Sequence, residues 1–287
     1  MMGHWRLGLI PQGDGGEGRV RAFVEALSSA LEIAIDLHHA ADYRALVSGL
    51  DQGLVHFAWL PPLSAARAVR SGSIVPAAIA VRHGATSYMT GLIALTRSGI
   101  RTPADLRGLR AAWVDRESAS GYVVIRAALR QMGVSLVDAF AEDIFVRSHQ
   151  DVALAVDSGR ADVGATCFNL ASGAVQMARH SLSNALGQPL RSVQIVAQAG
   201  PIPSDMFAVH RSVPAPMLAK IQTALVGARP ANLFDAAKTM MFADAFARPE
   251  PDHVRMLEQL YDTVISDKSR SSMPPPPMRS SRPPPRL

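Results

Sequence analysis

The strongest constraint on how this chain can fold is a regular alternation of strand-like and helix-like segments, which continues as far as residue 166. Residues 5–10 and 33–37 are short apolar runs of strand length, whereas residues 20–31 place their apolar side chains at helical spacing. Asp42 stands where it can cap the next helix, and residues 55–60 again have the pattern of a buried strand. This alternation predicts βαβ units, a largely parallel sheet and therefore an α/β fold.

One module occurs twice in the chain. The first copy spans residues 43–59 and the second spans residues 151–165. Each copy has a helical pattern, a glycine that can end the helix (Gly53 or Gly159) and a buried strand. Two copies this far apart suggest two similar lobes rather than a continuous solenoid.

The charge of the chain has an uneven distribution. The formal net charge is +5, but Lys268, Arg270, Arg279, Arg282 and Arg286 lie in a C-terminal segment without acids, and the other 24 basic residues are balanced by 24 acidic ones. Because the body is neutral, we expect no nucleic-acid partner. The apolar pattern stops at Ser266, and the prolines of residues 266–287 predict a disordered tail rich in proline, arginine and serine.

Targeting and metal signals are few. No apolar run has the length of roughly 20 residues that a spanning helix needs, so we expect a protein that does not cross the membrane. The N-terminus leads straight into a strand pattern without the features of a secretory signal, which leaves the compartment open. The neighbours His38 and His39 point to opposite faces of a strand and make a poor metal pair, and we expect no metal and no cofactor.

The segment from Asp115 to Tyr122 carries the clearest chemical signal. It follows the apolar run 109–114 and precedes apolar residues at helical spacing, so it lies between a buried strand and a helix. Backbone N–H groups at a helix start, together with the positive end of the helix dipole, favour an anion. Ser118 and Ser120 add hydroxyl donors at the same place. The alternative is that one serine is simply an N-cap.

Further motifs accompany this segment in a fixed order along the chain. They are Tyr43-x-x-Leu46, Phe57-Ala58-Trp59-Leu60-Pro61-Pro62, Ser87-Tyr88, Asp105-Leu106-Arg107-Gly108, Ser148-His149, Ala161-Asp162-Val163-Gly164-Ala165 and Pro201-Ile202-Pro203-x-Asp205. With this ordered set, the chain over residues 5–265 resembles the phosphate, phosphite and phosphonate-binding proteins of ABC importers, within the type 2 periplasmic binding protein superfamily.

The resemblance implies an α/β fold of two lobes joined by two crossing hinge strands. Lobe one would comprise residues 1–95 and 200–265, and lobe two residues 96–199. The implied function is capture of a small oxyanion in the cleft between the lobes for an ABC permease. It also implies a monomer and a periplasmic location.

The resemblance also assigns roles to individual residues. Tyr43 and Tyr88 match tyrosines whose hydroxyls face the ligand, and Ser118 and Ser120, with Gly121, match the anion-binding helix start. His149 matches a histidine that reaches the same oxygens, and Asp205 matches a carboxylate that can pair with an amino group on a phosphonate. Structural roles stay open beside these, since His149 can cap a helix with Ser148 and Asp205 can cap a loop.

The motifs depart from the resembled pattern at two places. Ala119 stands where a threonine is usual, which removes one hydroxyl donor. The segment Thr166-Cys167-Phe168-Asn169 lacks the second acid of relatives that bind aminoalkyl phosphonates, and we interpret Cys167 as a small buried residue. The ligand is therefore left open among phosphate, phosphite, a phosphonate or another small anion.

Two other classes of function compete with transport. An enzyme would need a nucleophile such as Ser118 or Ser120 with His149 as base, but the sequence identifies no acid to orient that base, so we predict a protein that is not an enzyme. A ligand-sensing domain whose closure signals to a partner is the second alternative.

Overall fold

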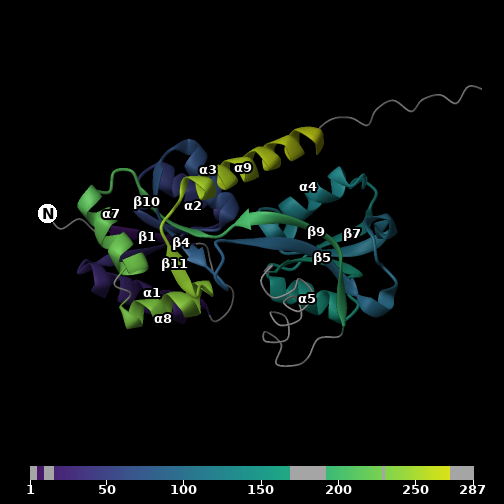
Figure 1. The fold of residues 1–287 in the computed structure, drawn as a ribbon, viewed down its shortest axis with the longest axis horizontal. Coiled ribbons are helices and arrows are strands. Elements are labelled where there is room, and N and C mark those ends of the chain that lie inside the picture. The colour runs from purple at the N-terminus through teal and green to yellow at the C-terminus, as the bar shows by residue number, and fades with distance from the viewer. Residues whose placement is uncertain (1–4, 10–15, 169–191, 228–229, 272–287) are drawn as a thin grey trace, which may run out of the picture.

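The chain folds into two α/β lobes, which lie side by side along the long axis of the molecule (Figure 1). This is seen in a computed structural model that describes residues 5–9, 16–168, 192–227 and 230–271. Each lobe has its own sheet. The α/β class and the two-lobed architecture expected from the sequence are confirmed.

The first lobe is built on a six-stranded sheet in the order β11-β4-β10-β3-β1-β2. Its strands are β1 (Trp5–Leu9), β2 (Ile35–His39), β3 (Phe57–Leu60), β4 (Ile74–Val81), β10 (Met206–His210) and β11 (Ala245–Ala247). Strand β1 pairs in parallel with β2 and β3, whereas β10 is antiparallel to β3 and β4. The helices are α1 (Gly16–Leu31), α2 (Tyr43–Asp51), α3 (Pro62–Ser71), α7 (Ala215–Gln222), η5 (Thr223–Gly227) and α8 (Ala231–Met241).

The second lobe is built on a five-stranded sheet in the order β7-β6-β8-β5-β9. Its strands are β5 (Ser87–Leu95), β6 (Leu109–Trp113), β7 (Phe140–Phe145), β8 (Val163–Phe168) and β9 (Val193–Pro203). The helical elements are η1 (Thr96–Ser98), η2 (Pro103–Leu106), η3 (Ala119–Val123), α4 (Val124–Gln131) and α5 (His149–Asp157). Thr102 and Asp105 form a capping box at the start of the short 3-10 helix η2.

Strands β5 and β9 connect the lobes. They pair antiparallel along most of their length, from Ser87 opposite Pro203 to Leu95 opposite Val193, and both run between the lobes in Figure 1. Strand β5, which the sequence analysis placed in lobe one, thus hydrogen-bonds within the second sheet. The exact lobe boundaries stay a prediction.

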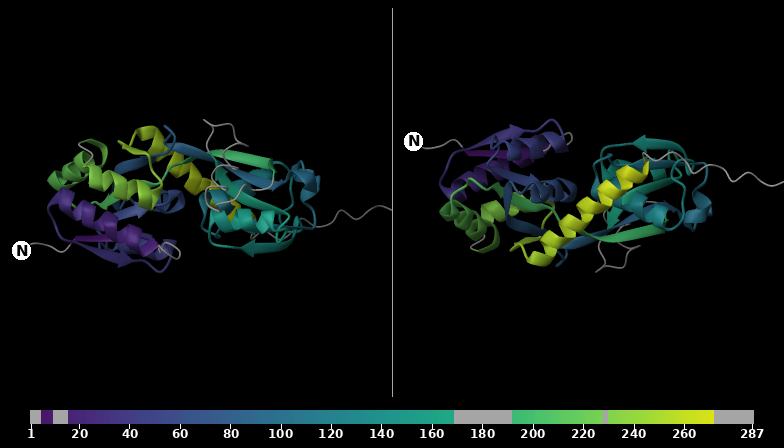
Figure 2. Two further views of the ribbon diagram at one scale, coloured as in Figure 1. Left: turned by 90° about the horizontal axis from the view of Figure 1, so that it is seen from below. Right: turned by 90° about the horizontal axis from the view of Figure 1, so that it is seen from above.

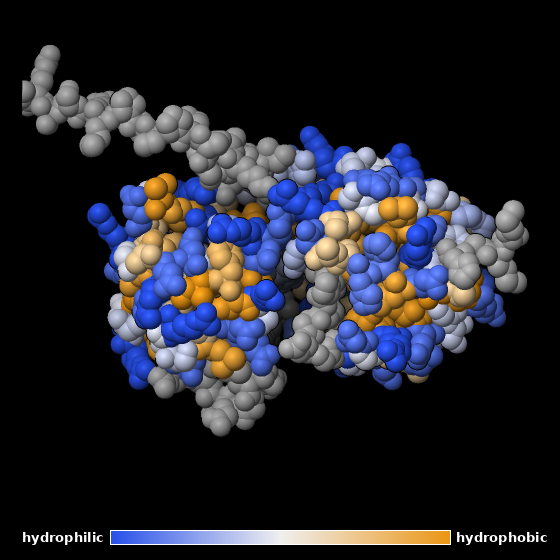
Figure 3. All heavy atoms as spheres, turned by 180° about the vertical axis from the view of Figure 1, so that it is seen from behind, coloured by the Kyte–Doolittle hydropathy of each residue, from blue (hydrophilic) through white to orange (hydrophobic). Residues whose placement is uncertain are grey.

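Apolar burial explains why each lobe forms. In the first lobe Phe23, Phe57 and Phe207 are fully buried in one cluster between the sheet and its helices. In the second lobe Trp113 and Leu129 are fully buried in a separate cluster. Figure 3 shows that the surface is hollowed between the lobes.

Helix α9 (Pro251–Ser271) is the long C-terminal element. It extends from the first lobe over α3 to α4 of the second lobe (Figure 2), and Leu257 and Leu260 are buried in the apolar cluster beneath it. The helix continues through residues 266–271, further than the apolar pattern predicted, whereas the rest of the predicted tail, 272–287, lies outside the described residues. Within the described part of the chain, no helix has both the length and the apolar character needed to cross a bilayer.

Candidate ligand-binding cleft

Ser118 and Gly121 build the start of the helix that faces the cleft. Ser118 is the N-cap of the π-helical turn η3, and its Oγ accepts the backbone N–H of Gly121 at 3.0 Å. A Cβ on Gly121 would lie 2.4 Å from Val114 Cγ2, so only glycine lets the turn pack against the end of β6. In this structure both residues therefore shape the turn, and the N-cap alternative applies to Ser118.

Ser120 is the serine of this motif that faces other polar side chains. It is 3% exposed, and its Oγ lies 3.4 Å from Nε2 of His149. A side-chain hydrogen bond also links it to Tyr88. The buried Thr90 hydroxyl donates to the carbonyl oxygen of Ser120 at 2.6 Å, which fixes the backbone there. Ser120 therefore stands at the junction of three elements: η3, β5 and α5.

His149 is the first residue of α5 and does not cap it. Ser148 does so, because its Oγ accepts the N–H of Asp151 at 3.0 Å. The imidazole instead lies against Ser120 and close to the thiol of Cys167. Burial lowers the pKa of His149, but Cys167 and the backbone of Ala165 together outweigh burial and raise it above its ordinary value. Burial raises the pKa of the Cys167 thiol, but His149 and then Arg82 outweigh burial and lower it.

The two tyrosines act as neutral donors. Burial raises the pKa of Tyr43 to about 12, helped by the negative charges of Asp115, Asp205 and Glu117. Burial raises the pKa of Tyr88 as well, followed by the charge of Asp205 and of Cys167. A phenol is neutral at neutral pH even at its ordinary pKa, and the raised pKa means that the cleft does not favour the phenolate, so each tyrosine carries an O–H that can donate.

Asp205 lies on the first-lobe side of the cleft and is already paired. Its Oδ2 accepts from Nη2 of Arg82 at 2.5 Å. The same guanidinium donates to the carbonyl oxygens of Met241 at 2.8 Å and Phe242 at 3.2 Å. Arg82 therefore ties the loop after β4 to the end of α8 as well as holding the carboxylate.

An ion-pair cluster crosses the cleft beside the anion motif. Glu117, in the second lobe, accepts from Nη2 of Arg44 on α2 at 3.1 Å and pairs with Arg67 on α3. Apolar contacts accompany it, because Leu63 of α3 packs against Val123 of η3. The structure thus holds the two lobes together at the helix start that carries Ser120.

The structure gathers the predicted site residues Tyr43, Tyr88, Ser118, Ser120, Gly121, His149 and Asp205 around the cleft. The sequence analysis missed Arg82 and interpreted Cys167 as a small buried residue. Cys167 is half-buried and contacts His149. No local pattern in the sequence singled out Arg82. Cys167 could have been singled out, because it lies in the segment where some relatives carry a second acid that binds the ligand.

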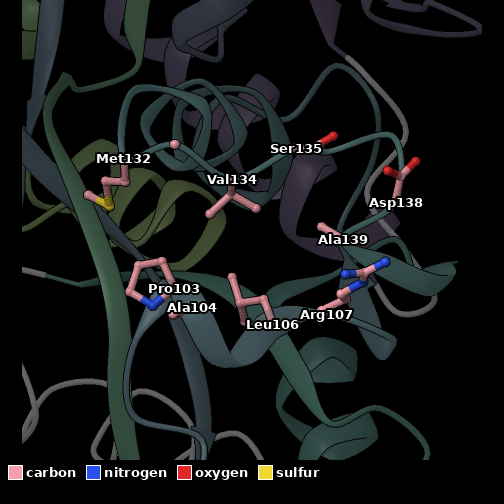
Figure 4. Close-up of a pocket in the computed structure, with 10 residues that line it drawn as sticks. Pro103, Ala104, Leu106, Arg107, Met132, Val134, Ser135, Asp138 and Ala139 are labelled. Atoms are coloured by element: carbon pink, nitrogen blue, oxygen red, sulfur yellow. The ribbon is translucent and has the colours of Figure 1, made fainter. Parts of the chain in front are cut away.

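We also searched the described residues for a metal site and for other pockets. The described residues contain no group of three or more His, Cys, Asp or Glu side chains placed to hold a metal ion. A pocket on the second lobe, shown in Figure 4, is lined by residues of η2, the end of α4 and the segment before β7, among them Pro103, Leu106 and Val134. It includes none of the predicted ligand-binding residues.

Comparison with known proteins identifies the family. A family profile described as "ABC transporter, phosphonate, periplasmic substrate-binding protein" matches residues 7–256, most of the chain. This chain belongs to that family. The chain is also similar to the "Phosphate-import protein PhnD" of Mycolicibacterium smegmatis, with 28% identity over 140 residues. That alignment covers 45% of this chain and 44% of the relative.

Solved structures show the same fold. A binding protein component of an ABC phosphonate transporter from Pseudomonas aeruginosa is similar with a TM-score of 0.74 and 20% identity, covering 95% of this chain and 90% of that one. PhnD1 from Prochlorococcus marinus, in complex with methylphosphonate, is similar with a TM-score of 0.68 and 17% identity, covering 91% of this chain and 98% of that one. The phosphonate-binding family expected from the ordered motifs is confirmed.

Proposed function

We propose that this chain captures a small tetrahedral oxyanion, a phosphonate, phosphite or phosphate, between its lobes. The convergence of Ser120, His149 and Tyr88 carries the proposal, because it places a hydroxyl, an imidazole and a neutral phenol at one point. Tyr43 adds a second phenol from the first lobe. Such an array matches the acceptor-rich surface of an oxyanion, and hydrogen bonds to charged groups are the strong ones.

In this proposal Ser118 and Gly121 act through the shape of the helix start, and Asp205 acts through its pairing with Arg82. Binding closes the lobes around the anion by bending at β5 and β9, and the closed form is what a permease would recognise. Membership in the family supports an ABC permease as the partner. The names of the relatives, a phosphate-import protein and a complex with methylphosphonate, support the anion class.

Capture without chemical conversion is the further part of the proposal. Asp205 and Glu117 are both engaged by arginines, and neither stands beside His149 as the orienting acid of a catalytic triad. A receptor needs to stabilise the ground state of its ligand, whereas an enzyme must bind the transition state more tightly. Phosphorus NMR of pure protein with a phosphonate or phosphate ester should recover the ligand unchanged. Steady conversion that disappears in Ser120→Ala would refute this part.

Calorimetry tests the binding proposal directly. The protein is titrated with phosphate, phosphite and methylphosphonate, and the best of these is repeated with Ser120→Ala. Loss of a donor to a charged group should weaken binding by about 1.5–3 kcal/mol. Ser98→Ala is the control, because Ser98 bonds only locally to the carbonyl oxygen of Leu95 and to the N–H of Ile100, outside the cleft. Equal affinity of Ser120→Ala and the wild type would refute the assignment.

A further inference from the structure

The charges around the cleft restrict the anions it can accept. Three carboxylates act on the phenol of Tyr43, namely Asp115, Asp205 and Glu117. Any of them could in principle receive a positively charged group on the ligand. Their existing partners decide which are available.

None of the three is without a partner. Glu117 is held by two arginines from α2 and α3. Asp115 uses its Oδ1 to accept the backbone N–H of Glu117 at 2.8 Å, which forms the turn before Ser118. Asp205 is the one whose charge also acts on Tyr88, and it is paired with Arg82.

The Arg82–Asp205 pair is costly to open. Both side chains are mostly buried, with 24% and 18% of their surfaces exposed. An incoming ammonium group would have to share Asp205 with the guanidinium already bound to Oδ2, or displace that guanidinium. Sharing places two positive charges side by side, and displacement leaves a mostly buried Arg82 without its carboxylate, so both are unfavourable. The carbonyl bonds to Met241 and Phe242 also hold Arg82 where it is.

The segment after β8 offers no further carboxylate for an ammonium group. The segment that follows β8, residues 169–191, contains no aspartate and no glutamate, and it includes Arg179 and Arg191. It therefore cannot supply a carboxylate to the cleft from its own side chains.

We propose that Arg82 sets the ligand class of this protein: by occupying Asp205, it makes the cleft select an oxyanion without a cationic group, such as methylphosphonate, over one that carries an ammonium group, such as 2-aminoethylphosphonate. This inference rests on the proposed function, since it concerns the same cleft. Arg82 acts here as a specificity-determining residue that works through Asp205.

The test is a ratio of two affinities, measured by calorimetry at neutral pH, where the primary amine is protonated. The wild type should bind methylphosphonate at least about tenfold more tightly than 2-aminoethylphosphonate, which corresponds to about 1.4 kcal/mol. Arg82→Gln, which releases Asp205, should shift this ratio by about tenfold or more toward the ammonium ligand. Thermal melting verifies that the variant is folded.

Arg110→Gln is the matched control. Arg110 pairs with Asp162 at 2.8 Å and donates to the carbonyl oxygen of Gly159, so it is a similar arginine clasp, but it lies in the second lobe outside the cleft. Its ratio should equal that of the wild type. Asp115→Asn should also leave the wild-type ratio unchanged.

The outcomes separate the two proposals. Failure of the wild type to bind phosphate, phosphite and methylphosphonate would refute the proposed function and this inference with it. Tight methylphosphonate binding together with equal or tighter binding of 2-aminoethylphosphonate would refute the inference alone. This comparison uses only the wild-type protein, so it tests the inference even if Arg82→Gln does not fold. A fall in 2-aminoethylphosphonate affinity in Asp115→Asn alone would assign the ammonium to Asp115 and also overturn it.

Discussion

The ion-pair cluster at Glu117 should control how easily the cleft closes. Glu117→Gln removes the negative charge that Arg44 and Arg67 share across the lobes, while it keeps the size of the side chain. Because the pairing joins residues of different lobes, its loss should destabilise the closed form relative to the open form. The fold of each lobe should be little affected.

The structure gives the size of the effect. The Arg44 side chain is 65% exposed, so its pair with Glu117 should contribute about 0.5 kcal/mol, as surface ion pairs do. The side chains of Arg67 and Glu117 are 17% and 19% exposed, so their ion pair should contribute about 1 kcal/mol, the upper end of the range for surface pairs. Glutamine keeps one acceptor oxygen, and we therefore expect a loss of about 1 kcal/mol, or about 5-fold in the closing equilibrium.

The apparent Kd for the oxyanion should rise by the same factor when the open form predominates without ligand, because the binding-competent fraction falls. Calorimetry measures the Kd, and small-angle scattering measures how far the ligand compacts the protein. Glu32→Gln is the control, since Glu32 pairs with Lys220 within the first lobe at 3.2 Å. An unchanged Kd in Glu117→Gln, or an equal rise in the control, would refute the role of this cluster in closure.

The pH dependence of the cluster has a definite sign. Burial raises the pKa of Glu117, but Arg67 and then Arg44 outweigh burial and lower it. A carboxylate with a lowered pKa contributes stability that is complete above its ordinary pKa and is lost as the pH falls through the lowered value. The difference in affinity between the wild type and Glu117→Gln should therefore be constant around neutral pH and shrink in acid.

Two further predictions follow from the cleft. Gly121→Ala should destabilise the protein by about 1–3 kcal/mol in denaturant unfolding, because its Cβ would overlap Val114, whereas Gly18→Ala in α1, where a Cβ meets no other atom, should be neutral or stabilising. Because contact with Cys167 raises the pKa of His149, the imidazolium should favour the anion below that raised value, and affinity should fall as the pH rises through it. Comparison with His149→Gln corrects for titration of the ligand itself, and an identical pH profile in the two proteins would contradict a role for His149.

The amino-acid sequence determined the local elements of this protein. Asp42 caps α2 by accepting the N–H groups of Arg44 and Ala45, and Ser148 caps α5, as their positions before helical patterns suggested. Periodicity placed β1, α1, β2, β3 and β6 within a few residues of their observed bounds. These features depend on residues that are neighbours in the chain, and so a local pattern is enough to predict them. The helix start at Ser118, on which the anion-binding prediction rests, was readable for the same reason.

Only the tertiary structure shows which side chains pair with the candidate ligand-binding residues. Arg82 and Asp205 are 123 positions apart, and Arg44 and Glu117 are 73 apart, so no local pattern indicates that either pair meets. The contact of Cys167 with His149 likewise arises only because β8 and α5 pack together. Long-range pairing depends on how the sheets assemble and how the lobes approach each other. The sequence could therefore propose candidate ligand-binding residues, but only the folded chain shows that Asp205 is already held by an arginine.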